Sequence, residues 1–126
     1  MAESYREQAI LDAVETNVPG NGYSHTTLEL TVTTTMGNGS MLVGTTEAAA
    51  ADAATVDGII DDAKFGSGFP DYEVGSVIPV RVATGHCIAN VDVIKFSDAA
   101  YAGEDLTVLA ANGVKFQTAD SVFTRI

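Results

Sequence analysis

The chain has 126 residues, 46% hydrophobic and 18% charged, with one cysteine and a formal net charge of −11. A chain of this length forms a single domain with a modest core. Its six basic residues against seventeen acidic ones argue against a nucleic-acid partner, because a phosphate backbone requires clustered Lys and Arg. Since the sequence has no run of about 18 apolar residues, it also predicts no membrane partner.

The single cysteine cannot form an intrachain disulfide and fits a reducing compartment. The first residues, MAESYREQAILDAVETNVPG, contain no apolar stretch of the kind found in signal peptides. We therefore expect the protein to be made in a cytoplasm.

The first segment, residues 1–22, is predicted to be an N-terminal arm. Residues 4–15, SYREQAILDAVE, favour a short helix that opens with a capping box. Ile10, Leu11 and Val14 recur at helical spacing and form a narrow apolar stripe. The letters PGNG that follow break the chain, so we expect the arm to be separate from the rest.

The remainder, residues 23–126, is predicted to be an all-β domain. Short stretches of alternating or continuous apolar residues are separated by turn residues, as is typical of strands. They are SHTTLELTVTTT (24–35), MLVG (41–44), TVDGIID (55–61), SVIPVRVA (76–83) and CIANVDVIKF (87–96). The alanine-rich TTEAAAADAAT between the second and third stretches favours a short helix or an ordered loop.

Three further features complete the prediction. Pro79 lacks a backbone N–H, so its strand is expected at a sheet edge or at a bulge. Asn112-Gly113 lies between two apolar runs in DLTVLAANGVKF, which is typical of a β-hairpin, and SVFTRI (121–126) reads as a last strand. About seven or eight short strands predict a small β-barrel, β-tulip-like or sandwich domain with short helical segments.

His86 and Cys87 are the residues that most suggest catalysis. Neighbouring residues of a strand point to opposite faces, whereas a base and its nucleophile must meet at about 3 Å. Cys87 shares its phase with Ala89 and Val91, which predicts a buried thiol. The interpretation is therefore a strand with a turn before it, and we expect no catalytic residue here.

A metal or cofactor site is not predicted. The one cysteine and two histidines show neither CxxC nor HxxxH spacing. Asp57, Asp61 and Asp62 lack the alternating spacing and the closing Glu of a calcium loop. We therefore expect a protein that is not an enzyme and that binds no cofactor.

From about Ser40 onward the chain resembles the head decoration proteins of tailed bacteriophages, the family of the lambda decoration protein. The resemblance lies in the order of three segments: GSMLVGTTEAAAADAATVDGII, then GSVIPVRVATGHCIANVDVIKF, then LTVLAANGVKF. Together they span about two thirds of the chain. The predicted helix at 4–15 departs from the family pattern.

This resemblance implies a structural virion protein without cofactor or catalytic residues. Family members are small β-rich domains that form homotrimers on the outer surface of the expanded capsid, at local three-fold positions. They bind the major capsid protein and stabilise the head against internal DNA pressure, and the N-terminal arm reaches into the lattice. The arm here has too little apolar surface to bury by itself, so the candidate contact residues are Tyr5, Ile10, Leu11, Val14 and Val18.

Two other functions remain open from the sequence. One is a different virion surface or tail binding module, such as a carbohydrate-binding β domain, for which Tyr23, Phe65, Phe69 and Tyr72 are the loosely clustered aromatic residues. The other is a small β-rich enzyme, whose single basis is the adjacent His86 and Cys87.

Overall fold

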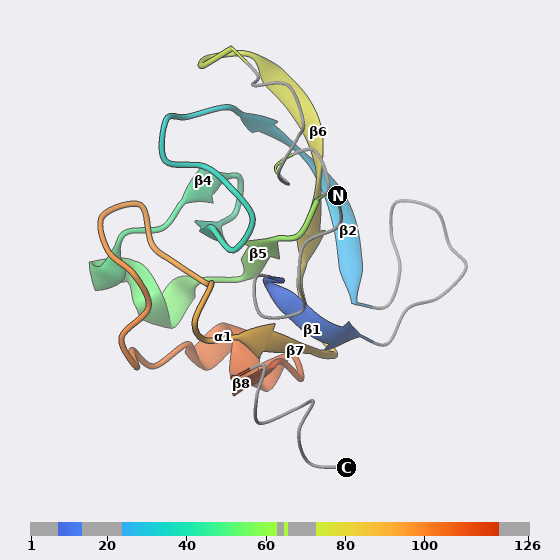
Figure 1. The fold of residues 1–126 in the computed structure, drawn as a ribbon, viewed down its shortest axis with the longest axis vertical. Coiled ribbons are helices and arrows are strands. Elements are labelled where there is room, and N and C mark those ends of the chain that lie inside the picture. The colour runs from blue at the N-terminus through green and yellow to red at the C-terminus, as the bar shows by residue number, and fades with distance from the viewer. Residues whose placement is uncertain (1–7, 14–23, 63–64, 66–72, 119–126) are drawn as a thin grey trace.

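The computed structural model describes residues 8–13, 24–62, 65 and 73–118. Within them the chain forms mostly short strands, which confirms the predicted all-β class (Figure 1). The strands are β1 (Ile10–Ala13), β2 (His25–Thr31), β3 (Met41–Val43), β4 (Thr46–Glu47), β5 (Gly58–Ile60), β6 (Val77–Ala83), β7 (Cys87–Asn90) and β8 (Lys115–Gln117). The helices are a 3-10 helix, η2 (Ala50–Thr55), and α1 (Thr107–Ala111).

The larger sheet is antiparallel and curled, with the strand order β2-β6-β5-β3-β4. β6 is its longest member together with β2, and the two pair over their whole length without a shift in register. Apolar residues of alternate positions face the inside of the curl, as the period of two predicts. They form a cluster of Leu30, Leu42, Ile60, Val80 and Val82.

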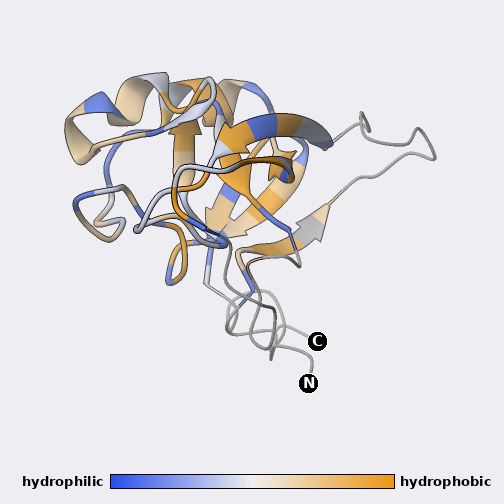
Figure 2. Ribbon diagram, turned by 90° about the horizontal axis from the view of Figure 1, so that it is seen from above, coloured by the Kyte–Doolittle hydropathy of each residue, from blue (hydrophilic) through white to orange (hydrophobic). Residues whose placement is uncertain are grey.

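The smaller sheet has the order β1-β7-β8, with β1 antiparallel and β8 parallel to β7. It lies near the end of the larger sheet that is far from the start of β6, and α1 packs against η2 on the same side (Figure 1). Figure 2 shows that the strands are mostly hydrophobic and that the connecting loops carry more of the hydrophilic residues. The main core lies between these layers and includes Met41, Ile59, Cys87, Ile94 and Leu109.

The predicted helix at residues 4–15 is wrong where the structure describes it, because residues 10–13 form strand β1. Leu11 is buried, and the strand pairs antiparallel with β7. Asn90, at the end of β7, donates its side-chain N–H to the carbonyl of Gln8 at 3.0 Å and its backbone N–H to Ala9 at 2.8 Å. A helix of about three turns is marginal by itself, whereas the edge of β7 offers the segment backbone partners, with one shift in register between Ile10 and Asp12.

These residues are therefore part of the body rather than a separate arm, although residues 1–7 and 14–22 of the predicted arm lie outside the described residues. The predicted last strand at 121–126 also lies outside them.

The predicted hairpin at Asn112-Gly113 is wrong, because the segment before it forms helix α1. Gly113 has a φ of +89° and ends this helix. Val114 donates its N–H to the carbonyl of Leu109 at 3.1 Å, and Gly113 donates to Ala110 at 3.2 Å, the two bonds of a Schellman motif. Asn-Gly satisfies a helix end as readily as a hairpin turn, and burial of Leu109 selects the helix.

Each of the other described strand predictions contains a strand, but over fewer residues: 24–35 contains β2, and 55–61 contains only β5, because Thr55 belongs to η2. The predicted strand 87–96 ends at Asn90, because the Asn90 side-chain oxygen accepts the Asp92 N–H at 3.0 Å and the chain turns. Pro79 lies in β6, which is internal to the sheet, but β5 pairs only with Val82 and Ala83. Beside Pro79 itself, β2 is the one strand that pairs in the described part of the chain.

Candidate functional site

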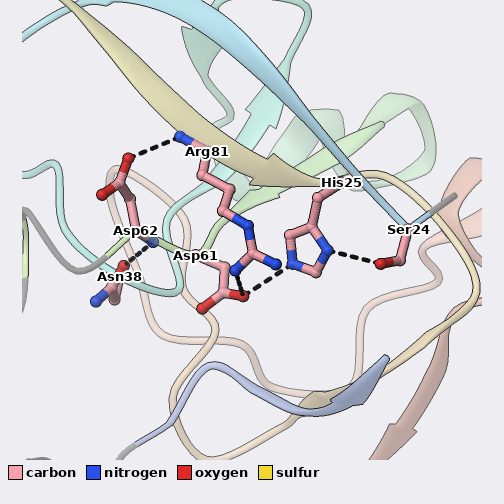
Figure 3. A network of polar contacts seen from close by, with 6 residues as sticks. All are labelled: Ser24, His25, Asn38, Asp61, Asp62 and Arg81. Carbon is pink, nitrogen blue, oxygen red and sulfur yellow. Dashed lines mark hydrogen bonds and ion pairs between the residues drawn. The ribbon is translucent and has the colours of Figure 1, made fainter. Parts of the chain in front are cut away.

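A partly buried polar cluster ties the start of β2 to the residues that follow β5 (Figure 3). Ser24 Oγ lies 2.7 Å from Nδ1 of His25, and Nε2 of His25 lies 2.8 Å from Oδ2 of Asp61. Arg81 Nη1 approaches the same carboxylate oxygen at 3.3 Å. Ser24 is fully buried and His25 is 6% exposed, so two polar side chains are held inside the fold.

The backbone fixes each member of this cluster. Ser24 precedes β2, and its carbonyl accepts the N–H of Thr84 at 2.8 Å. Asp61 follows β5 and donates its backbone N–H to the carbonyl of Arg81 at 3.0 Å. Asp62 accepts the Arg81 backbone N–H on its own carboxylate at 2.8 Å. The cluster therefore continues the β5–β6 ladder beyond the last paired strand residues.

A serine, a histidine and an aspartate joined by hydrogen bonds are also the members of a hydrolase triad, but the atoms they use here are different. We call Ser24, His25 and Asp61 the His25 clamp. In a triad the serine contacts Nε2 and the carboxylate contacts Nδ1. Here Ser24 contacts Nδ1 and Asp61 contacts Nε2. Ser24 has 0% exposure, so its hydroxyl is not accessible to a substrate. The clamp keeps the buried imidazole hydrogen-bonded on both sides, as burial of a polar ring requires.

His86 and Cys87 lie on opposite sides of the chain, as their phase predicts. Cys87 is buried in the main core, and burial raises the pKa of its thiol to about 11, with a further contribution from the Asp61 carboxylate. His86 is exposed and has a φ of 49°, in the left-handed region. A thiol with this pKa is almost wholly protonated near neutrality and is a poor nucleophile.

A shallow depression with a volume of about 430 Å³ lies beside His86. It forms where the β6–β7 turn meets the end of α1, because His86 donates its N–H to the carbonyl of Asn112 at 3.1 Å. The lining residues are Thr84, Gly85, His86, Ala111, Asn112 and Gly113. Sequence reasoning missed this depression, since its two walls are distant in the chain. The glycines are the available signal: a Cβ on Gly85 would lie 2.6 Å from the Asn112 carbonyl oxygen.

An exposed apolar tip, Val74 and Val77, lies where β6 begins. Val74 is 57% exposed and Val77 is 62% exposed. Gly75, between them, has a φ of +94° and donates its N–H to the carbonyl of Val32 at 2.8 Å. This turn is bonded to the residue after β2, so the two valines are presented by ordered backbone. Val77 lies in the predicted strand 76–83, but the local sequence pattern does not reveal the tip.

The predicted contact residues of the arm are only partly described. Leu11 is 8% exposed, and Ile10 is half-buried against the main core. The premise that these two side chains need a partner to cover them is therefore wrong. Tyr5, Val14 and Val18 lie outside the described residues.

The remaining candidates have simple outcomes. Of the aromatic residues considered for a binding groove, Phe65 is half-buried against the inner cluster of the curled sheet, while Tyr23, Phe69 and Tyr72 lie outside the described residues. Within the described ranges, no group of three His, Cys, Asp or Glu side chains is placed to hold a metal ion. No helix in that same part of the chain has the length and apolarity needed to cross a membrane. Comparisons of the sequence with protein-family models and curated proteins, and of the fold with solved structures, found no match.

Proposed function

We propose that this chain is a structural virion protein that binds the outside of a tailed-phage head and stabilises the expanded capsid. It acts as a homotrimer at local three-fold positions, with the major capsid protein as its partner. The proposal starts from the resemblance of residues 40–126 to head decoration proteins, whose segments coincide here with β3, β5, β6, β7 and the α1–β8 unit.

The observation that carries the proposal is the exposed apolar tip, Val74 and Val77. Burying a valine side chain contributes about 1.5–3 kcal/mol, so two of them on ordered backbone favour contact with a protein surface. The start of β6 projects at one end of the curled sheet, away from the small sheet (Figure 1). A tip in this position can contact a partner protein without rearranging the main core or the inner cluster of the curled sheet.

The burial of the most reactive side chains supports the same structural function. The His25 clamp and the Cys87 thiol are buried, so their chemistry serves the fold rather than a substrate. Many identical contacts on a capsid lattice add through multivalency, so a small apolar tip is sufficient at each position.

The test uses expanded heads assembled without this chain, to which purified protein is added. We expect co-sedimentation with the heads, density at the three-fold positions by electron cryomicroscopy, and higher resistance of the heads to heat. The double variant Val74→Asp and Val77→Asp should fold normally and bind at least tenfold more weakly. The control is Ala51→Asp with Ala54→Asp, which adds the same charge to exposed positions of η2 and should bind like the wild type.

Failure of the wild-type protein to bind heads would disprove the decoration function. Equal binding by the valine variant would show that the tip is not the contact.

A different virion or tail binding module is the second candidate, and the depression beside His86 is the feature that favours it. Its lining includes the polar groups of Thr84, His86 and Asn112 but no Phe, Tyr or Trp side chain. Carbohydrate sites commonly use an aromatic face, so this feature supports the candidate less than the apolar tip supports decoration. A glycan array with hits that Asn112→Ala abolishes, together with no head binding, would favour the second function.

A further inference from the structure

The outer edge of β2 has the properties of a strand-pairing surface. β2 is the terminal strand of the larger sheet, and in the part of the chain that the structure describes it pairs only with β6. Seven consecutive residue pairs join the two strands without a bulge. The sequence HTTLELT contains neither Pro nor Lys, two residues that commonly protect an edge from pairing, and Glu29 is its one acidic residue.

The direction of the backbone groups along β2 follows from two hydrogen bonds at its ends. Thr84 donates its N–H to the carbonyl of Ser24, and Val32 donates to Ser76, each at 2.8 Å. In an antiparallel ladder the bonded pairs alternate with pairs whose backbone groups point outward. Even-numbered residues of β2 therefore bond to β6. The N–H and C=O groups of Thr27, Glu29 and Thr31 point away from β6, toward the edge.

The side chains of β2 define what can lie beside it. Thr27, Glu29 and Thr31 are exposed on the outer face. Leu30 is fully buried on the inner face, while Leu28 is only half-buried against the inner cluster. A strand added to this edge would cover Leu28 with an apolar side chain and would place a residue without negative charge opposite Glu29.

We propose that the occupant is β2 of a second copy, paired antiparallel about a two-fold axis at Leu28. In this register Leu28 faces Leu28 of the second copy, and Glu29 faces Thr27. A two-fold axis at Glu29 would oppose two like charges, and one at Thr27 would leave Leu28 opposite Thr26. A slip by one residue would turn the leucines to the outer face. Of these registers, the one centred on Leu28 pairs the leucines on the inner face and also avoids opposed charges on the outer face.

The contact is weak for two isolated molecules. It adds a few backbone hydrogen bonds and covers one leucine per copy, while each chain carries a formal net charge of −11. Association should therefore strengthen as salt screens the repulsion. The inference rests on the geometry of β2 and goes beyond the proposed function. On a capsid, such two-fold contacts would join neighbouring trimers, each of which sits on a three-fold axis.

The test is disulfide trapping in a Cys87→Ala background. Leu28 and its counterpart form a non-hydrogen-bonded pair, whose Cα atoms lie about 4.5 Å apart, within the range of a disulfide. Leu28→Cys should form a covalent dimer under mild oxidation at least tenfold faster than Thr26→Cys. In the second variant the two cysteines are about 13 Å apart along the strands, too far to bridge.

Two further measurements keep the test decisive. If Leu28→Cys fails to fold, a mixture of the exposed variants Thr27→Cys and Glu29→Cys should give the mixed dimer in excess over either homodimer. Thr27→Pro removes an outward N–H without touching the β6 ladder, so it should abolish trapping while Thr27→Ala preserves it. Equal trapping of folded Leu28→Cys and Thr26→Cys, no mixed excess, or trapping that persists in Thr27→Pro would each overturn the proposal.

Discussion

The Nε2 atom of His25 lies 2.8 Å from Oδ2 of Asp61, which joins the first residue of β2 to the residue that follows β5. The two residues are 36 positions apart in the chain. β6 lies between their strands in the sheet, so this side-chain bond spans a whole strand. The buried imidazole therefore helps to fix the curl of the larger sheet.

Removal of this imidazole should destabilise the fold. His25→Ala leaves the buried Ser24 hydroxyl and the Asp61 carboxylate without their shared partner, and loss of a buried hydrogen-bonded group costs about 1–3 kcal/mol. We expect the free energy of unfolding in urea to fall by about 2 kcal/mol or more. Thr27→Ala, on the exposed face of the same strand, is the control and should change it by less than about 0.5 kcal/mol. An equally small effect of His25→Ala would show that the clamp does not contribute.

The buried thiol should make the protein less stable at alkaline pH. Burial raises the pKa of Cys87 to about 11, so in that range the unfolded chain loses its thiol proton at a lower pH than the folded protein does. The unfolded state then binds fewer protons, and the free energy of unfolding falls as pH rises from about 9 to 11. We expect a total loss of about 2 kcal/mol, because each tenfold difference in proton affinity between the two states corresponds to roughly 1.4 kcal/mol.

Urea unfolding at pH 8 and at pH 10.5 measures this loss. In Cys87→Ala the decrease should be smaller by most of that amount, because lysines and tyrosines titrate equally in both proteins. Parallel pH profiles for the two proteins would contradict the assignment. A thiol probe should react with native protein many times more slowly than with unfolded protein.

The first strand should be needed for the stability of the body. Leu11→Ala removes a buried side chain from β1, and such truncations cost about 2–5 kcal/mol. Deletion of residues 1–13 should cost more, because Asn90 also loses its bonds to Gln8 and Ala9. Deletion of residues 1–7 leaves β1 in place and is the control. Thermal unfolding followed by circular dichroism would decide the matter, and a 14–126 protein as stable as the full chain would contradict β1 as a body strand.

The helix end at Gly113 should tolerate no side chain. Gly113→Ala forces an L-residue to a φ of +89° and places a Cβ 3.0 Å from Nδ1 of His86. We expect a loss of about 1–2 kcal/mol in the free energy of unfolding. Gly37→Ala is the matched control, because its Cβ would meet only the Lys95 ammonium at 3.7 Å. Similar stabilities of the two variants would count against the Schellman end of α1.

The sequence predicted the elements whose local pattern is unambiguous. In β2 and β6 a strict alternation of apolar residues identified both strands and the faces they bury. The phase of Cys87 with Ala89 predicted a buried thiol, and the structure buries both residues. These predictions succeed because the side-chain period of a strand is a local property of the chain.

The same local reasoning failed where two structures share one pattern. Ile10 and Leu11 fit a helix by spacing, yet the open edge of β7 recruits them into β1. Asn112-Gly113 fits a hairpin by composition, yet it ends helix α1. In both cases the deciding partner, β7 or the main core around Leu109, is far away in the sequence.

By itself, then, the sequence determined the all-β class, the strands with period two and the side of the chain on which the thiol is buried. Only the tertiary structure decided that Ser24, His25 and Asp61 meet, that Val74 and Val77 form an exposed tip, and that β2 is the terminal strand of the larger sheet among the described strands. The physical reason is that alternation and turn chemistry act between near neighbours. Hydrogen bonds across 36 residues and the choice of an edge strand depend on which segments pack together.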